Sequence, residues 1–258
     1  MMGRGIRVSL KGVWGGRRAI ALPIGLALIW ALCRLTNPWD LLLYTTLDSE
    51  IALVLVPLFL FLLHRDLEHP AEALVAIRLG KARTWWATHV ASAGISAVIM
   101  AGAVGVFVIM VPLVTHGWSW HWGPNAHLRM NNGVLASPEW RIPWRWGIEA
   151  LGLLTVGLWS MGVLMYVLAL WWRSPWVAWI VVVSLGFGTE ALEGTAMRPL
   201  LWGIPGVQYS LALHWAGQHV VPPYWSTVYA LALLAVAVGV GMVIADTAPW
   251  GSSHGGTL

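Results

Sequence analysis

The chain has 258 residues, of which 58% are hydrophobic and only 10% are charged. A soluble domain carries roughly a quarter charged residues, so the few charges here cannot cover a water-exposed surface. We therefore expect an all-α integral membrane protein whose surface is largely in contact with the lipid bilayer. The formal net charge of +4 comes from basic residues that flank apolar runs, a pattern that argues against a nucleic-acid partner. Cys33 is the only cysteine, which excludes an intrachain disulfide and a multi-cysteine metal site.

Residues 1–18 form a basic leader with apolar side chains at helical spacing. Its basic residues are Arg4, Arg7, Lys11, Arg17 and Arg18. The apolar residues that share one helical face are Ile6, Leu10, Val13 and Trp14. This pattern predicts an amphipathic helix that lies on the inner membrane surface.

Six apolar runs follow the leader, at residues 19–35, 48–63, 85–115, 144–172, 175–192 and 225–245. Because a spanning helix needs about 20 largely apolar residues, these runs predict six transmembrane helices. The start of the second run is open: it lies either near Asp48 or at Leu41, which would enclose Asp48 and Glu50. We favour the start near Asp48, since an unpartnered carboxylate within the membrane costs several kcal/mol.

Basic residues outside the runs are divided unevenly between the two sides of the predicted membrane. Besides the leader, one side carries Arg65, Arg78, Lys81, Arg83 and Arg173. The other side, with longer loops, carries Arg34, Arg129, Arg141, Arg145 and Arg198. The positive-inside rule then places both termini in the cytoplasm. Tryptophans at the ends of the runs predict an aromatic belt at each interface. The inner belt comprises Trp85, Trp86, Trp171, Trp172, Trp176 and Trp250, and the outer belt comprises Trp118, Trp120, Trp122, Trp140, Trp144, Trp146, Trp215 and Trp225.

The loop at residues 64–84 has the signals of a short amphipathic helix on the cytoplasmic side. Pro70 suits a helix start and Gly80 suits a helix end. The apolar face comprises Leu67, Ala71, Leu74 and Ile77. The charged residues, acidic first and basic last as the helix dipole favours, are Glu68, Glu72, Arg78, Lys81 and Arg83. Such a helix either binds a partner protein or rests on lipid headgroups, and the local sequence leaves both interpretations open.

Two long loops are predicted on the outer side. Residues 193–224 are too apolar for a free loop, and a break at 203–206 divides them into two halves. They form either a re-entrant hairpin or an extracellular cap. Residues 116–143 contain three histidines beside three tryptophans: His116, His121 and His127 with Trp118, Trp120 and Trp122. This loop suggests either haem or metal binding or an ordinary interfacial segment, and the irregular spacing favours the second.

Common catalytic signatures are absent from the sequence. It contains no G-x-x-x-x-G-K-[ST] phosphate loop, no H-E-x-x-H and no G-x-S-x-G. No predicted loop is long enough to hold a soluble domain. We therefore expect that the chain is not an enzyme and binds no cofactor of its own. Glu149, Glu190 and His89 are ionisable groups near the ends of predicted spans, where such groups usually face a partner or a cavity.

This layout resembles the membrane permease subunit of a bacterial type-2 ATP-binding cassette (ABC) exporter. The similarity lies in the basic leader, the six spans, the cytoplasmic helix after the second span and the broken hairpin before the sixth. Residues 72–85, Glu-Ala-Leu-Val-Ala-Ile-Arg-Leu-Gly-Lys-Ala-Arg-Thr-Trp, are similar to the stretch before the third span of that family. A departure is that residues 77–81 replace the family's Pro-x-[ST]-Arg turn, which affects the register of the helix.

The resemblance implies a permease in the bacterial cytoplasmic membrane that pairs with a second permease chain. A separate ATPase subunit would bind ATP and Mg²⁺ and would grip the helix at residues 67–83. The implied coupling residues are Leu67, Glu68, Glu72, Leu74, Arg78, Lys81, Arg83 and Arg173. Candidate residues of the substrate path or gate are Glu149, Glu190 and Glu193.

Two rival functions remain. The first is a membrane haem-handling protein that uses His121, His127 and the neighbouring tryptophans, although the W-G-x-x-W-x-W-D signature of such factors is absent. The second is an intramembrane protease that uses Glu190 and Glu193 with His214 and His219 on the same side, for which no paired motif is present. Both rank below the permease.

Overall fold

The computed structural model describes residues 2–15, 17–33, 37–46, 54–67, 82–115, 119–123, 143–192 and 223–247. Within these ranges the regular elements are helices, and no strand occurs among them. The prediction of an all-α protein is confirmed for this part of the chain. Most of the predicted coupling helix and the loop after residue 192 lie outside it.

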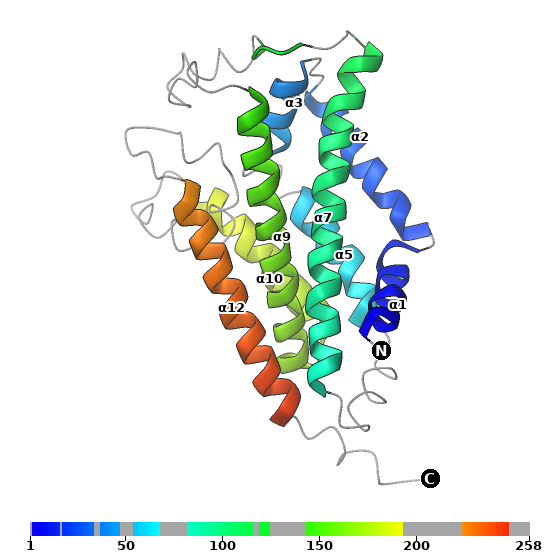
Figure 1. The fold of residues 1–258 in the computed structure, drawn as a ribbon, viewed down its shortest axis with the longest axis vertical. Helices are drawn as coiled ribbons and strands as arrows, with labels where there is room; N and C mark the ends of the chain where they lie inside the picture. The colour runs from blue at the N-terminus through cyan, green and yellow to red at the C-terminus, as the bar shows by residue number, and fades with distance from the viewer. Residues whose placement is uncertain are drawn as a thin grey trace.

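The helices form an elongated bundle (Figure 1). The described elements are α1 (Met2–Trp14), η1 (Arg17–Ile20), α2 (Ala21–Cys33), α3 (Pro38–Thr45), α5 (Val56–Leu67), α7 (Ala82–Thr115), α9 (Pro143–Trp172), α10 (Pro175–Leu192) and α12 (Pro223–Thr247). Helix α9 lies in the middle of the bundle and contacts α3, α5, α7, α10 and α12. The leader helix α1 lies against α5 and α7.

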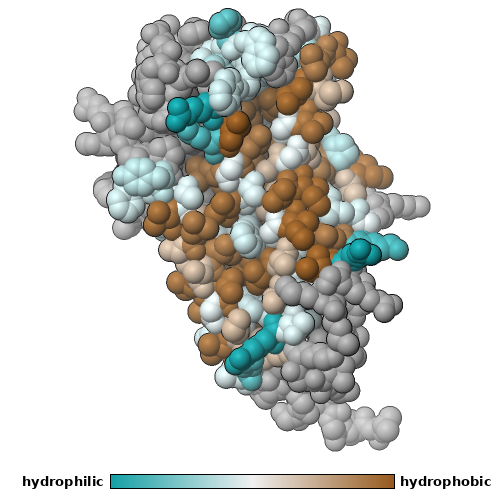
Figure 2. Space-filling view, in the orientation of Figure 1, coloured by the Kyte–Doolittle hydropathy of each residue, from teal (hydrophilic) through white to brown (hydrophobic). Residues whose placement is uncertain are grey.

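Three of the described helices are long and apolar enough to cross a membrane: α7, α9 and α12. Two shorter apolar stretches are Ala21–Ala31 and Pro175–Leu185. Figure 2 shows hydrophobic residues over much of the visible face of the bundle. These features are compatible with a membrane protein.

Most predicted runs coincide with a helix, but the second run is more complex. Helix α5 ends at Leu67, beyond the predicted end at 63, and a separate helix α3, which was not predicted, precedes it. Helix α3 begins because the Asn37 side chain accepts hydrogen bonds from the backbone N–H groups of Trp39 and Asp40, with Pro38 at the first helical position. The favoured start near residue 48 lies outside the described residues.

Several tryptophans tie helices together instead of lying in an interfacial belt. Trp86 is 0% exposed and Trp146 is 3% exposed, so the prediction that these two belong to the belts is wrong. A buried indole N–H needs an acceptor, and neighbouring helices supply it. The hydrogen bonds between helices run from Trp14 Nε1 to Ser96 Oγ (3.1 Å), Trp86 Nε1 to Val238 O (3.0 Å), Trp159 Nε1 to Val90 O (2.9 Å) and Trp179 Nε1 to Pro57 O (3.3 Å).

Candidate functional site

The predicted coupling residues lie at or between the helix ends that flank residues 68–81, or in the turn between α9 and α10. Leu67 is the last residue of α5, and Arg83 is the second residue of α7. Arg173 occupies the α9–α10 turn with a positive φ of 52°. Glu68, Glu72, Leu74, Arg78 and Lys81 lie outside the described residues. We use the name junction for the described residues that anchor the two flanking helix ends: His64, Arg83, Trp86, Trp176 and Asp246.

At the first side of the junction, the end of α5 is held on the α9–α10 hairpin. His64 is 1% exposed, and its ring centroid lies 4.1 Å from that of Trp176 at an interplanar angle of 44°. Trp176 is the second residue of α10, close to the turn at Arg173. Further along the same two helices, the indole N–H of Trp179 donates to the carbonyl of Pro57. A displacement of the α5 end therefore acts on α10.

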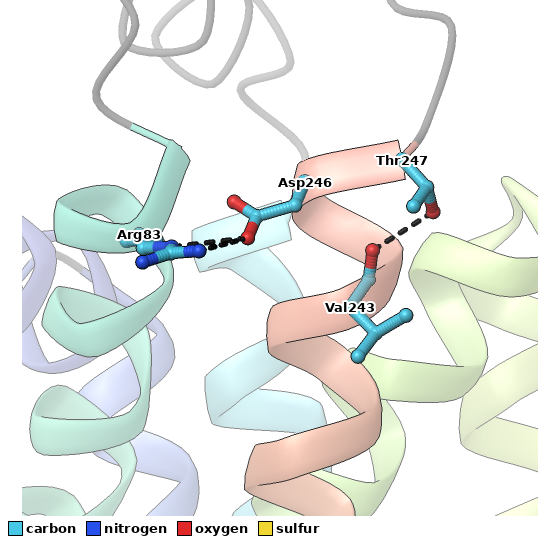
Figure 3. Close-up of polar contacts among 4 residues, drawn as sticks. All are labelled: Arg83, Val243, Asp246 and Thr247. Atoms are coloured by element: carbon cyan, nitrogen blue, oxygen red, sulfur yellow. Dashed lines mark hydrogen bonds and ion pairs between the residues drawn. The ribbon is translucent and has the colours of Figure 1, made fainter.

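At the second side of the junction, the start of α7 is held on the end of α12. The Nε and Nη2 atoms of Arg83 lie 3.0 and 2.9 Å from Oδ2 of Asp246 (Figure 3). One turn further along α7, the ring of Trp86 packs on Gly241, where an added Cβ would collide with it. The indole N–H of Trp86 donates to the carbonyl of Val238. A displacement of the α7 start therefore acts on α12.

The two contacts between α7 and α12 differ in strength. The Arg83 side chain is 74% exposed and that of Asp246 is 34% exposed, so water screens this ion pair and it contributes little to stability. The Trp86 ring is completely buried, and burial of a large aromatic side chain contributes more than such a pair. We infer that Trp86 holds the two helices together, while the ion pair orients the first turn of α7.

His89 belongs to an aromatic cluster close to the junction. It is 8% exposed, and its Nδ1 atom lies 3.0 Å from the carbonyl oxygen of Trp85. Its ring centroid is 4.3 Å from that of Trp85 and 5.6 Å from that of Tyr166 in α9. These contacts give His89 a packing role between α7 and α9.

The candidate gate residues are only partly described. Glu149 lies near the start of α9, where its Oε1 is 3.6 Å from Nε of Arg145 one turn earlier. Glu190 lies in α10, but its side chain is outside the described part, and so is the whole of Glu193. That these three carboxylates share a path stays a prediction.

At the other end of the bundle, residues 119–123 are bound to the start of α3, and we call them the 119–123 strap. The Asn37 side chain donates to the carbonyl of His121 (3.1 Å), and the Trp39 indole donates to the carbonyl of Ser119 (2.9 Å). The backbone N–H of Gly123 donates to Oδ1 of Asp40, a fully buried carboxylate (3.0 Å). His121 therefore contributes its main chain to this contact. The other histidines of the predicted haem or metal loop, His116 and His127, lie outside the described residues.

Three residues that the structure makes prominent were not among the predicted site residues: Asp40, Trp86 and Asp246. Asp40 had a local signal, because Asn-Pro-Trp-Asp at 37–40 is a helix-start pattern with an acid in the first turn. Asp246 and Trp86 had no local signal in the sequence, since their partners lie more than a hundred residues away along the chain. Among the described residues, no group of three His, Cys, Asp or Glu side chains could hold a metal ion.

Comparisons with protein-family models, curated proteins and solved structures gave no match to the chain. The geometry of the junction and the pattern of the sequence are therefore the basis on which a class of protein can be proposed.

Proposed function

We propose that the chain is the membrane permease subunit of an ATP-driven ABC exporter. In this proposal it crosses the bacterial cytoplasmic membrane six times with both termini inside, and it forms the substrate path together with a second permease chain. A separate ATPase subunit binds residues 67–83. The long apolar helices, the basic leader and the resemblance of residues 72–85 support this assignment.

The observation that carries the proposal is the anchoring of the two helix ends that flank residues 68–81. The helix before this segment is attached to the α9–α10 hairpin through His64 and Trp176. The helix after it is attached to α12 through Arg83, Trp86 and Asp246. A segment anchored at each end to a different part of the bundle can convert one push into relative movement of those parts.

In the proposed cycle, closure of the ATPase dimer around ATP displaces residues 67–83. The displacement passes to α10 at one end and to α12 at the other, so the bundle changes shape around the substrate path. Glu149, Glu190 and Glu193 line or gate that path. Arg83, at the end of the ATPase-binding segment, also pairs with Asp246 within the chain and so transmits the movement to α12.

The first experiment is co-purification of the tagged full-length chain with an ATPase that carries a phosphate loop. We then expect Arg83→Glu to lower the permease-dependent ATPase rate of the reconstituted complex, because two carboxylates would face each other at the end of α12. Charge reversal at Glu72 or Arg78 is expected to uncouple hydrolysis as well, through the ATPase contact.

A charge exchange between Arg83 and Asp246 distinguishes the loss of their ion pair from the loss of a contact with the ATPase. The double variant Arg83→Asp with Asp246→Arg restores an ion pair and is expected to recover most of the rate. The matched control is Thr115→Glu, which places a carboxylate at an exposed position at the opposite end of α7 and is expected to keep the wild-type rate. Failure to recover any ATPase with the chain, or wild-type coupling in the Glu72, Arg78 and Arg83 variants together, would refute the proposed function.

A further inference from the structure

The leader helix α1 is attached to the bundle by a polar seam. Ser9 Oγ donates to Ser92 Oγ over 2.7 Å, and both residues are buried. The Trp14 indole donates to Ser96 Oγ over 3.1 Å, and Val13 is 1% exposed. Hydrogen bonds in a buried setting fix the rotation of a helix about its own axis. These contacts turn one face of α1 toward α7.

The opposite face of α1 carries positive charge. Arg7 and Lys11 are exposed and lie one turn apart, on the side of the helix away from Ser9 and Val13. In the described part of the chain neither forms an ion pair. Along the sequence, the first acid after the leader is Asp40, 29 residues after Lys11. The exposed face of α1 is thus a cationic surface without a local counter-charge in the sequence.

This cationic face lies at the edge of apolar surface. Exposed apolar residues begin at the end of η1 and continue along α2, and they comprise Ile20, Ile24 and Leu28. On α7 the exposed apolar residues begin beside Ser96 and include Ile95, Val98 and Ile99. Figure 1 shows α2 continuing away from α1 toward the far end of the bundle. In a bilayer, charged headgroups lie next to the acyl chains. Arg7 and Lys11 lie in the same way next to the exposed apolar residues of α2 and α7.

From these observations we propose that the exposed face of α1 is a binding surface for anionic phospholipid headgroups, with Arg7 and Lys11 as the contacting residues. The proposal rests on the membrane location in the proposed function but does not require an ATPase. A lipid phosphate provides the negative charge that the leader lacks. Each basic residue near an anionic membrane surface strengthens association about five-fold.

The test uses the full-length protein released from mixed micelles that contain equal amounts of phosphatidylglycerol and phosphatidylcholine. Native mass spectrometry measures the ratio of the two bound lipids. We expect the wild type to retain phosphatidylglycerol preferentially. The variant Arg7→Gln with Lys11→Gln should lower this preference by up to about twenty-five-fold, that is about five-fold for each charge removed.

Two matched variants make the result decisive. Arg7→Lys with Lys11→Arg keeps both charges and is expected to keep the preference, which shows that folding of α1 is not the cause of a loss. Arg145→Gln removes an exposed charge elsewhere and is expected to have no effect. Unchanged preference in the double Gln variant, or an equal loss in Arg145→Gln, overturns the proposal.

The outcome for the lipid surface is distinguishable from the outcome for the proposed function. If the double Gln variant loses the ATPase and keeps the lipid preference, the basic face binds protein, and the lipid proposal is wrong. If the wild type fails to co-purify with an ATPase but keeps its lipid preference, only the proposed function is refuted.

Discussion

At the scale of single residues, glycines decide where large side chains can enter a neighbouring helix. Gly241 accommodates the Trp86 ring, and an added Cβ would lie 2.6 Å from Cε2 of that ring. Gly94 does the same for Trp159. Gly239, two residues from Gly241, has open space at the Cβ position. Of these two glycines of α12, Gly241 is therefore needed to make room for the Trp86 ring, whereas Gly239 is not needed for packing.

We expect Gly241→Ala to lower the free energy of unfolding by about 1–3 kcal/mol, because the new methyl group overpacks the interface between α7 and α12. The measurement is denaturant unfolding of the purified protein in detergent. Gly239→Ala is the matched control, and it should leave the stability unchanged or raise it by up to about 1 kcal/mol through helix propensity. Equal effects of the two substitutions would contradict the packing of Trp86 on Gly241.

At the scale of elements, the start of α3 and the 119–123 strap form one unit. Asp40 is in the first turn of α3 and accepts the N–H of Gly123, while Asn37 both caps the helix and binds His121. An added side chain at Gly123 would collide with the Asp40 carboxylate. The close approach of the two segments thus depends on glycine at this position.

We expect Asp40→Ala to cost about 1–3 kcal/mol of unfolding free energy, because a buried N–H loses its acceptor. Asp40→Asn keeps a carbonyl oxygen at the same place and should cost less. Hydrogen exchange at the Gly123 amide should accelerate in Asp40→Ala and change little in Glu149→Ala, which removes a partly exposed carboxylate from another helix. Normal exchange and stability in Asp40→Ala would show that the carboxylate does not hold the strap.

The elements themselves were largely predictable, whereas their contacts were not. The helices α7, α9, α10 and α12 follow the predicted runs to within a few residues, because length and apolar content determine them. Helix α3 was not predicted, because its eight residues are too few to stand out as a span. The partners of Trp86 and Arg83 depend on how distant helices pack, which a local pattern does not specify.

At the scale of the whole molecule, the apolar surface begins at different levels on two sides of the bundle. Beside α1, the exposed large apolar residues of α7 begin at Ile95. On α12 they continue to Val243, close to Asp246 and hence to the level of Arg83. A bilayer has a hydrocarbon core of about 30 Å, so we expect the bundle to tilt or the bilayer to deform locally.

The orientation of residues 68–81 is the property on which the proposed coupling depends. In a Cys33→Ser background, single cysteines introduced in place of Leu74, Arg173 and His127 can be labelled with a maleimide that does not cross membranes. We expect positions 74 and 173 to react only from the cytoplasmic side and position 127 only from the outside, since basic loops stay inside. Labelling after permeabilisation shows that each cysteine is reactive. Reaction of position 74 from the outside would place residues 68–81 on the side opposite to a cytoplasmic ATPase. The ATPase could then not move α10 or α12 through this segment, and the proposed coupling would be wrong.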